Sequence, residues 1–148
     1  MGTVLVETYI DRPPGEVFSY VRDYSNEALW QAGHVSKARV EPPGPARVGT
    51  RVHKVRRAGG RDESFMIEIT EMDERARRWT DLTITGSFRG TKGSWEVLPE
   101  GRGSRVRLTA EMRAPGLMRL LLPFIDRVAR KDLASEFEAL KRVLEPGK

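Results

Sequence analysis

The sequence predicts an α+β fold in which a curved, seven-stranded antiparallel sheet wraps around one long C-terminal helix. Two observations support this prediction. From residue 3 to residue 112, short runs of alternating apolar and polar residues are separated by turn signals roughly every ten residues, which is typical of antiparallel hairpins. From residue 116 to residue 144, the apolar residues change to helical spacing.

The N-terminal part of the chain predicts one strand and two short helices. Residues 3–10 are rich in β-branched and aromatic residues, and their apolar members alternate as in a strand. Residues 16–22 carry apolar residues at helical spacing. A cap-like cluster starts at Asp23 and opens a second short helix that ends near Trp30. These two helices lie between the first and second strands.

Six more strands are predicted after the short helices. The loop at 42–49 contains three prolines and two glycines, which fit neither a helix nor a sheet ladder. Three glycines in the middle strands are expected bend points that let the sheet curve: Gly86, Gly90 and Gly93. The predicted strands cover 33–41, 50–57, 63–71, 77–85, 87–98 and 104–112.

The C-terminal helix carries one apolar stripe from residue 118 to residue 144. Pro123 lies inside this stripe, and a proline removes a backbone hydrogen bond from a helix. We therefore expect the helix to kink or split near Leu122.

Length and composition restrict the class of protein. The 148 residues correspond to a single domain, 1–148, and the absence of cysteine excludes disulfides, thiolate nucleophiles and cysteine metal sites. The N-terminus shows no signal-peptide pattern, and the longest apolar run, 117–125, is far shorter than the roughly 20 residues that span a bilayer. We expect a soluble, cytoplasmic protein.

The net charge of +5 raises the alternative of a nucleic-acid partner. Acidic residues are interspersed with the arginines almost everywhere, so the sequence favours an ordinary solvated surface over a nucleic-acid site. No phosphate loop, no metal-binding cluster and no catalytic triad is recognisable, and we expect no metal and no cofactor.

Five segments of the chain resemble the START-like, Bet v 1-like (SRPBCC) superfamily, and within it the bacterial polyketide cyclase/dehydrase and lipid-transport group. They occur in the same order as in the family. One departure is DERAR at 73–77, where the family usually has a proline-rich turn. The segments are PGEVFSYVRDYSNEALW (14–30), VGTRVHKVRRAGGR (48–61), IEITEMDERARRW (67–79), EGRGSRVRLTAEM (100–112) and LASEFEALKRVLE (133–145).

The resemblance implies a helix-grip fold with a ligand cavity between the sheet and the C-terminal helix. Family members bind lipids, sterols, quinones, polyketides or plant hormones, and some of them are aromatases or cyclases. Fold likeness therefore implies where the site lies but leaves the chemistry open. The residues expected at the cavity walls are Phe65, Ile67, Trp95, Val97, Met118, Leu121 and Ile125, with Val52 and Lys54 beside them.

Two ionisable residues on the strands are candidates for contact with a ligand. If Val52 faces inward, Lys54 and Arg56 share that face, and Lys54 either pairs with an acidic ligand or reaches out to the rim. The register of strand 77–85 is ambiguous. Facing Leu82 inward buries more apolar area, so we predict Asp81 outside; if it is inside, a salt bridge to Lys54 or Arg56 is expected.

The remaining candidates have structural interpretations. We expect His34 at a solvated loop edge and His53 on the surface. Aromatic side chains suit planar ligands but equally suit a packed core. This alternative stays open for Trp30, Trp79 and Trp95.

Three functions remain open from the sequence. The first is a carrier or sensor of a small hydrophobic ligand, and the second is a polyketide cyclase, aromatase or dehydratase. The third is an interaction protein that uses its arginine-rich surface. A cavity without a buried ionisable residue would exclude the second, and a filled core would favour the third.

Overall fold

A computed structural model describes residues 2–31, 35–58 and 60–145. In this part of the chain, seven strands form one antiparallel sheet in the order β1-β7-β6-β5-β4-β3-β2. The predicted fold class is therefore confirmed. The strands are β1 (Gly2–Ile10), β2 (Val35–Glu41), β3 (Arg51–Ala58), β4 (Arg61–Asp73), β5 (Arg78–Thr83), β6 (Lys92–Glu100) and β7 (Gly103–Met112).

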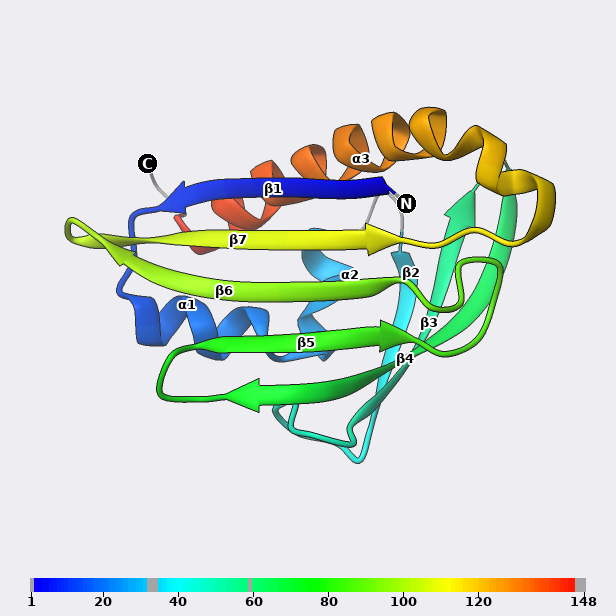
Figure 1. Cartoon of the computed structure of the whole chain (residues 1–148). Helices are drawn as coiled ribbons and strands as arrows, with labels where there is room; N and C mark the ends of the chain where they lie inside the picture. The colour runs from blue at the N-terminus through cyan, green and yellow to red at the C-terminus, as the bar shows by residue number, and fades with distance from the viewer. Residues whose placement is uncertain (1, 32–34, 59, 146–148) are drawn as a thin grey trace.

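The helices lie together on one side of the curved sheet (Figure 1). Three short helical segments separate β1 from β2 where two short helices were predicted, because the second predicted helix begins as a 3₁₀ turn that leads directly into an α-helix. The longest helix follows β7. The helices are α1 (Pro14–Val21), η1 (Tyr24–Asn26), α2 (Glu27–Trp30), η2 (Gly116–Leu121) and α3 (Leu122–Leu144).

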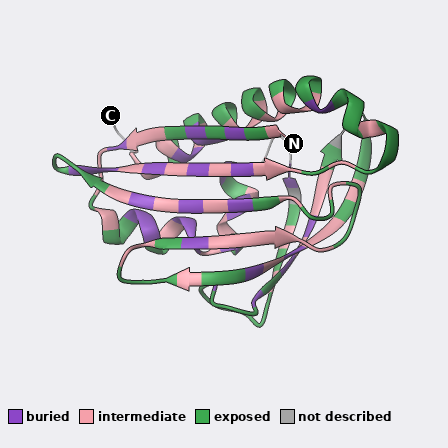
Figure 2. Ribbon diagram, viewed as in Figure 1, coloured by how far each residue is buried: buried purple, intermediate pink, exposed green. Residues whose placement is uncertain are grey.

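Strand alternation separates the core from the outer face of the sheet. Figure 2 shows buried residues alternating with more exposed ones along β1, β6 and β7. In β1, Val4, Val6 and Ile10 are buried while Leu5 is exposed. The alternation arises because successive side chains of a strand point to opposite faces, and only one face meets the helices.

The connection between β5 and β6 differs from the prediction. β6 begins at Lys92 instead of residue 87, and Gly86 and Gly90 have positive φ angles of 96° in the turns before it. These two glycines are therefore turn residues and not bend points of a strand, and that expectation was wrong. Gly93 does lie within β6. The irregularities of the sheet fall instead at Val35/Lys37 in β2 and Ile69/Glu71 in β4.

The predicted split near Leu122 is confirmed. The 3₁₀ helix η2 ends at Leu121, and α3 begins at Leu122 with Pro123 in its first turn. A proline fits there because the first N–H groups of a helix have no partner within it. The C-terminal half of α3 buries Phe137 and Leu140 in the core.

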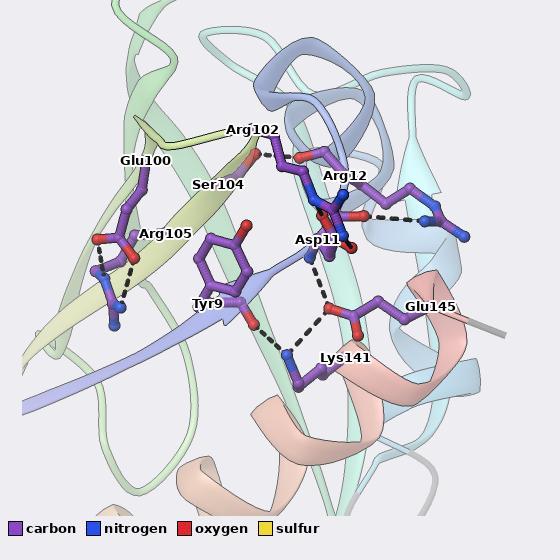
Figure 3. Close-up of polar contacts among 9 residues, drawn as sticks. All are labelled: Tyr9, Asp11, Arg12, Glu100, Arg102, Ser104, Arg105, Lys141 and Glu145. Carbon is purple, nitrogen blue, oxygen red and sulfur yellow. Dashed lines mark hydrogen bonds and ion pairs between the residues drawn. The ribbon is translucent and has the colours of Figure 1, made fainter. Parts of the chain in front are cut away.

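The C-terminal end of α3 is tied to the end of β1 (Figure 3). Lys141 Nζ donates to the carbonyl oxygen of Tyr9 at 2.7 Å and lies 3.0 Å from Glu145 Oε2. The same Glu145 oxygen accepts the backbone N–H of Asp11 at 2.6 Å. Arg102 binds the Asp11 carboxylate through two hydrogen bonds of 2.9 Å. These contacts hold one end of α3 against the sheet.

Several basic side chains on the outer face of the sheet are paired with carboxylates. Arg105 bonds to Glu100 at 2.8 Å, and Arg107 contacts both Glu7 and Glu96. Each of these pairs brings opposite charges together on the outer face of the sheet. No helix of the described residues combines the length and the apolar character needed to cross a bilayer.

Candidate ligand-binding cavity

A cavity of about 550 Å³ lies between the inner face of the sheet and α3. Strands β3 to β7 form one wall, the N-terminal half of α3 forms the other, and α2 reaches one end through Glu27. Its volume is within the range of roughly 300–1,000 Å³ that small-molecule sites show. The apolar walls include Phe65, Ile67, Leu108, Met112, Phe124 and Val128.

The structure brings together five of the nine residues predicted at the cavity walls. These are Lys54, Phe65, Ile67, Trp95 and Ile125.

The other four predicted wall residues do not line the cavity. Val52 and Val97 lie on the inner face of the sheet, as the cavity residues do, but they are fully buried in the hydrophobic core. Met118 and Leu121 lie on η2, and Leu121 is 55% exposed. The change from 3₁₀ to α-helix at Leu122 shifts the angular phase of the stripe, so its first two members do not share the face of Ile125.

A buried ion pair lies at the α2 end of the cavity. Lys54 Nζ is 2.7 Å from Glu27 Oε1, and these side chains are 8% and 2% exposed. The sequence predicted that Lys54 faces inward but missed Glu27 as its partner. The nearest signal was the cap-like cluster at Asp23, which accepts the N–H of Ser25 and starts the helical turns that carry Glu27 inward.

Asp81 points into the cavity, so the prediction that it lies outside was wrong. Its Oδ2 accepts hydrogen bonds from the Tyr24 hydroxyl at 2.7 Å and from Trp95 Nε1 at 3.0 Å. Trp79 Nε1 donates to the same Tyr24 hydroxyl at 2.9 Å. The salt bridge expected for an inward Asp81 is absent among the described residues, because Lys54 pairs with Glu27 instead.

Aromatic packing explains the observed register of β5. Inward placement of Trp79 lets its ring stack on Trp95, with ring centroids 5.6 Å apart and planes 1° from parallel. Phe18 packs against the same ring at 5.5 Å. A buried indole removes more apolar area from water than Leu82 does, and its N–H is satisfied by Tyr24. Trp30 and Trp79 belong to the core, whereas Trp95 also lines the cavity.

Burial shifts the proton affinity of this polar cluster. It raises the pKa of Glu27, and Lys54 acts in the opposite direction. Burial also raises the pKa of Asp81, whereas the hydrogen bonds from Tyr24 and Trp95 and the charge of Lys54 lower it in part. The pKa of Tyr24 lies well above its ordinary value, chiefly through burial. The carboxyl groups therefore take up protons more readily than exposed ones, while Tyr24 stays a neutral donor.

Two polar groups at this end can serve a bound molecule. Gln31 is 3% exposed and lines the cavity, and its Oε1 accepts no hydrogen bond from the described residues. Lys54 Nζ carries three donor hydrogens and lies 2.7 Å from Glu27 Oε1 in an ion pair, so it can also donate to a ligand. A ligand that offers both an acceptor and a donor would meet both groups.

The histidines lie apart from this cluster. His53 is on the outer face, as predicted, and its Nε2 lies 2.9 Å from Glu41 Oε2. The expectation for His34 falls outside the described residues.

A family model described as "Polyketide cyclase / dehydrase and lipid transport" matches residues 1–145. The comparison with curated proteins found no matching sequence. Among solved structures, TTHA0849 from Thermus thermophilus is 26% identical, with 97% of each chain covered and a TM-score of 0.82.

Two more distant structures share the fold. The di-domain ARO/CYC BexL from the BE-7585A biosynthetic pathway is 24% identical with a TM-score of 0.76; the match covers 96% of this chain and 46% of BexL. A START superfamily protein from Mycobacterium smegmatis is 12% identical with a TM-score of 0.78, over 96% of each chain. At these identities the likeness shows the helix-grip architecture alone.

Proposed function

Because the chain belongs to the polyketide cyclase/dehydrase and lipid-transport family, we propose that it binds one small hydrophobic ligand in the cavity beneath α3, as a carrier or sensor. The main observation that supports this proposal is that the cavity has an apolar body and a buried polar end. The ligand class that fits is a lipid, quinone or polyketide-like molecule with an oxygen-bearing end.

The apolar walls support the hydrophobic part of this proposal. Phe65 and Leu108 on the sheet face Ile125 and Leu133 on α3 across the cavity. Each apolar group of a ligand that leaves water for such a wall contributes about 25 cal/mol per Å². Trp95 adds a flat indole face, which suits a planar or conjugated ligand.

The polar end supports an oxygen on the ligand. An oxygen at this end accepts from Lys54 Nζ, and a hydroxyl or enol there donates to Gln31 Oε1. A purely hydrocarbon ligand would leave both groups without these partners, which is unfavourable for buried polar atoms. The polar end therefore orients the ligand, with its apolar part toward Phe124 and Val128.

Native mass spectrometry of protein purified gently from its own cells tests the proposal. We expect a stoichiometric apolar molecule to accompany the protein, and extraction then identifies it. An empty protein that also leaves its tryptophan fluorescence unchanged with menadione and with dodecanoic acid would contradict ligand binding.

Replacement of Trp95 tests the position of the ligand. Trp95→Ala removes an aromatic wall and should weaken binding by about tenfold or more, measured by calorimetry with the extracted ligand. Arg51→Ala is the matched control, because Arg51 pairs with Glu68 on the exposed outer face. Comparable losses in the two variants would contradict an apolar cavity site, and Trp95→Phe separates wall loss from general unfolding.

A second candidate function is catalysis of cyclisation or dehydration. The favouring observation is that Glu27 and Asp81, two carboxyl groups with raised pKa, line the same cavity beside Lys54. Such groups can move a proton at a bound carbonyl compound. If the extracted ligand is consumed on incubation with the protein, and Asp81→Asn prevents its consumption, the result would support catalysis. If the ligand is unchanged, the carrier or sensor function is retained and catalysis is rejected.

The third hypothesis, an interaction protein, would be favoured by a filled core. The cavity between the sheet and α3 gives it no such support. The cytoplasm stays the proposed location.

A further inference from the structure

The segment that follows β7 exposes a cluster of large apolar side chains. Exposed fractions are 83% for Leu117, 79% for Leu120, 55% for Leu121, 64% for Phe124 and 43% for Val128. All five lie on η2 or the first turns of α3. We call these five residues the η2–α3 patch.

The η2–α3 patch differs from the other exposed apolar residues of the described chain. Leu5, Leu29, Val48 and Val143 are each exposed singly on different parts of the fold. Single exposed apolar residues are ordinary, whereas a contiguous cluster marks an interaction site. Water contact with five neighbouring side chains is unfavourable unless another surface covers them.

The patch borders the opening of the cavity. Phe124 and Val128 line the cavity although they are largely exposed, so their side chains join the inner wall to the outer surface. In Figure 1, η2 lies at the end of the molecule away from the anchored C-terminal end of α3. A surface that covers the patch would therefore meet the opening.

Basic side chains flank the patch. Five are exposed within residues 113–131, whereas the acidic Asp126 and Asp132 are only partly exposed. An apolar face bordered by arginine and lysine is the pattern of segments that lie in the head-group region of an anionic membrane. The basic residues are Arg113, Arg119, Arg127, Arg130 and Lys131.

We propose that the η2–α3 patch docks on an anionic lipid bilayer. Its leucines and Phe124 enter the boundary between head groups and acyl chains, and the flanking basic residues contact lipid phosphates. Arg119, in the middle of the η2 leucines, can do so because its long side chain keeps its charge in the head-group layer. Docking presses the cavity opening against the membrane, where a hydrophobic ligand is taken up or released; this last step rests on the proposed function.

Sedimentation with vesicles tests the docking. We expect the protein to bind vesicles of phosphatidylcholine with one third phosphatidylglycerol, and to bind pure phosphatidylcholine far more weakly. High salt should reduce the binding, because the charge contribution is screened. The double variant Leu117→Ser/Leu120→Ser should lose at least about tenfold in partitioning, since two apolar side chains no longer leave water.

The matched control is Val143→Ser, near the other end of α3. Val143 is also exposed, at 39%, but 15 residues beyond Val128, or about 22 Å along the helix. It should bind vesicles like the unchanged protein, and all variants should keep their circular dichroism spectrum because these side chains are on the surface.

Three results would overturn the docking: no binding to either vesicle, equal losses in the patch variant and the control, or a patch-dependent dimer without vesicle binding in analytical ultracentrifugation. If the protein binds vesicles but fails the mass-spectrometry and fluorescence tests of ligand binding, the docking is retained and its role in ligand transfer is rejected. The failure of docking is thus separate from the failure of the proposed function.

Discussion

Glu27 and Lys54 form a buried ion pair at the polar end of the cavity. Each charge is removed from water, and each compensates for the other at 2.7 Å. The Nζ of Lys54 also lies 5.6 Å from the centre of the Phe65 ring, which adds a cation–π contact. The pair is therefore both a structural contact and a part of the cavity wall.

Removal of one partner should destabilise the protein strongly. Lys54→Met leaves Glu27 buried without its cation, and the free energy of unfolding should fall by about 3–5 kcal/mol. Urea denaturation followed by tryptophan fluorescence measures this change. The pKa of Glu27 should rise further in the variant, because Lys54 is what opposes the effect of burial.

The double variant Lys54→Met/Glu27→Met provides the control. Replacement of a whole buried ion pair by apolar residues is often neutral, so it should recover most of the stability lost in Lys54→Met. A double variant no more stable than the single one would show that the loss arises from packing and not from an uncompensated charge.

At the level of elements, β5 and β6 are held in register by a close approach at Gly93. A Cβ atom built on Gly93 would lie 2.5 Å from Asp81 Oδ1, which is closer than atoms can pack. The pairing of Asp81 with Gly93 across the two strands places them side by side. Glycine is therefore needed here to leave room for the carboxylate.

Gly93→Ala should displace the Asp81 carboxylate and lower the stability by about 1–3 kcal/mol, measured by thermal unfolding. Trp95 should lose its hydrogen-bond acceptor at the same time, and its fluorescence should change. Gly15→Ala in α1 is the control, because nothing lies within 4 Å of a Cβ there. A loss of the same size in the control would contradict the close-approach explanation.

Helix α3 has two ends with different surroundings. Its C-terminal end is held by Lys141 and Glu145 against β1, whereas its N-terminal end carries the exposed η2–α3 patch beside the cavity. The split at Leu122 lets η2 turn its leucines outward. One helix thus supplies a fixed core contact and an exposed apolar surface.

For the whole molecule, the raised pKa of Asp81 makes stability depend on pH. Below its ordinary value of 3.8, the carboxyl group is protonated in both the folded and the unfolded protein. Between that value and the higher folded pKa, the folded state binds more protons. Stability therefore falls as the pH rises through this interval, by at most about 1.4 kcal/mol per pH unit.

The comparison with Asp81→Asn isolates this contribution. The unfolding free energy of the unchanged protein should fall relative to that of the variant as the pH rises from about 4, measured by urea denaturation at several pH values. Exposed carboxylates act oppositely: Arg105 lowers the pKa of Glu100, but this effect is common to both proteins and cancels. Parallel curves would contradict a raised pKa for Asp81.

The sequence by itself determined the elements and much of the apolar wall. Alternation placed Lys54, Phe65, Ile67 and Trp95 on the inner face, because a strand's side chains point to opposite faces whatever it packs against. Pro123 determined where the C-terminal helix splits, since proline cannot donate a helical hydrogen bond.

Only the tertiary structure decided the polar end. Glu27 reaches Lys54 from a helix 27 positions earlier in the chain, and no local pattern encodes that meeting. Asp81 faces inward because Trp79, two residues before it, stacks on Trp95 of the next strand, and this packing outweighs the burial of Leu82. Contacts between distant elements set the energy of each alternative, so alternation alone could not choose between them.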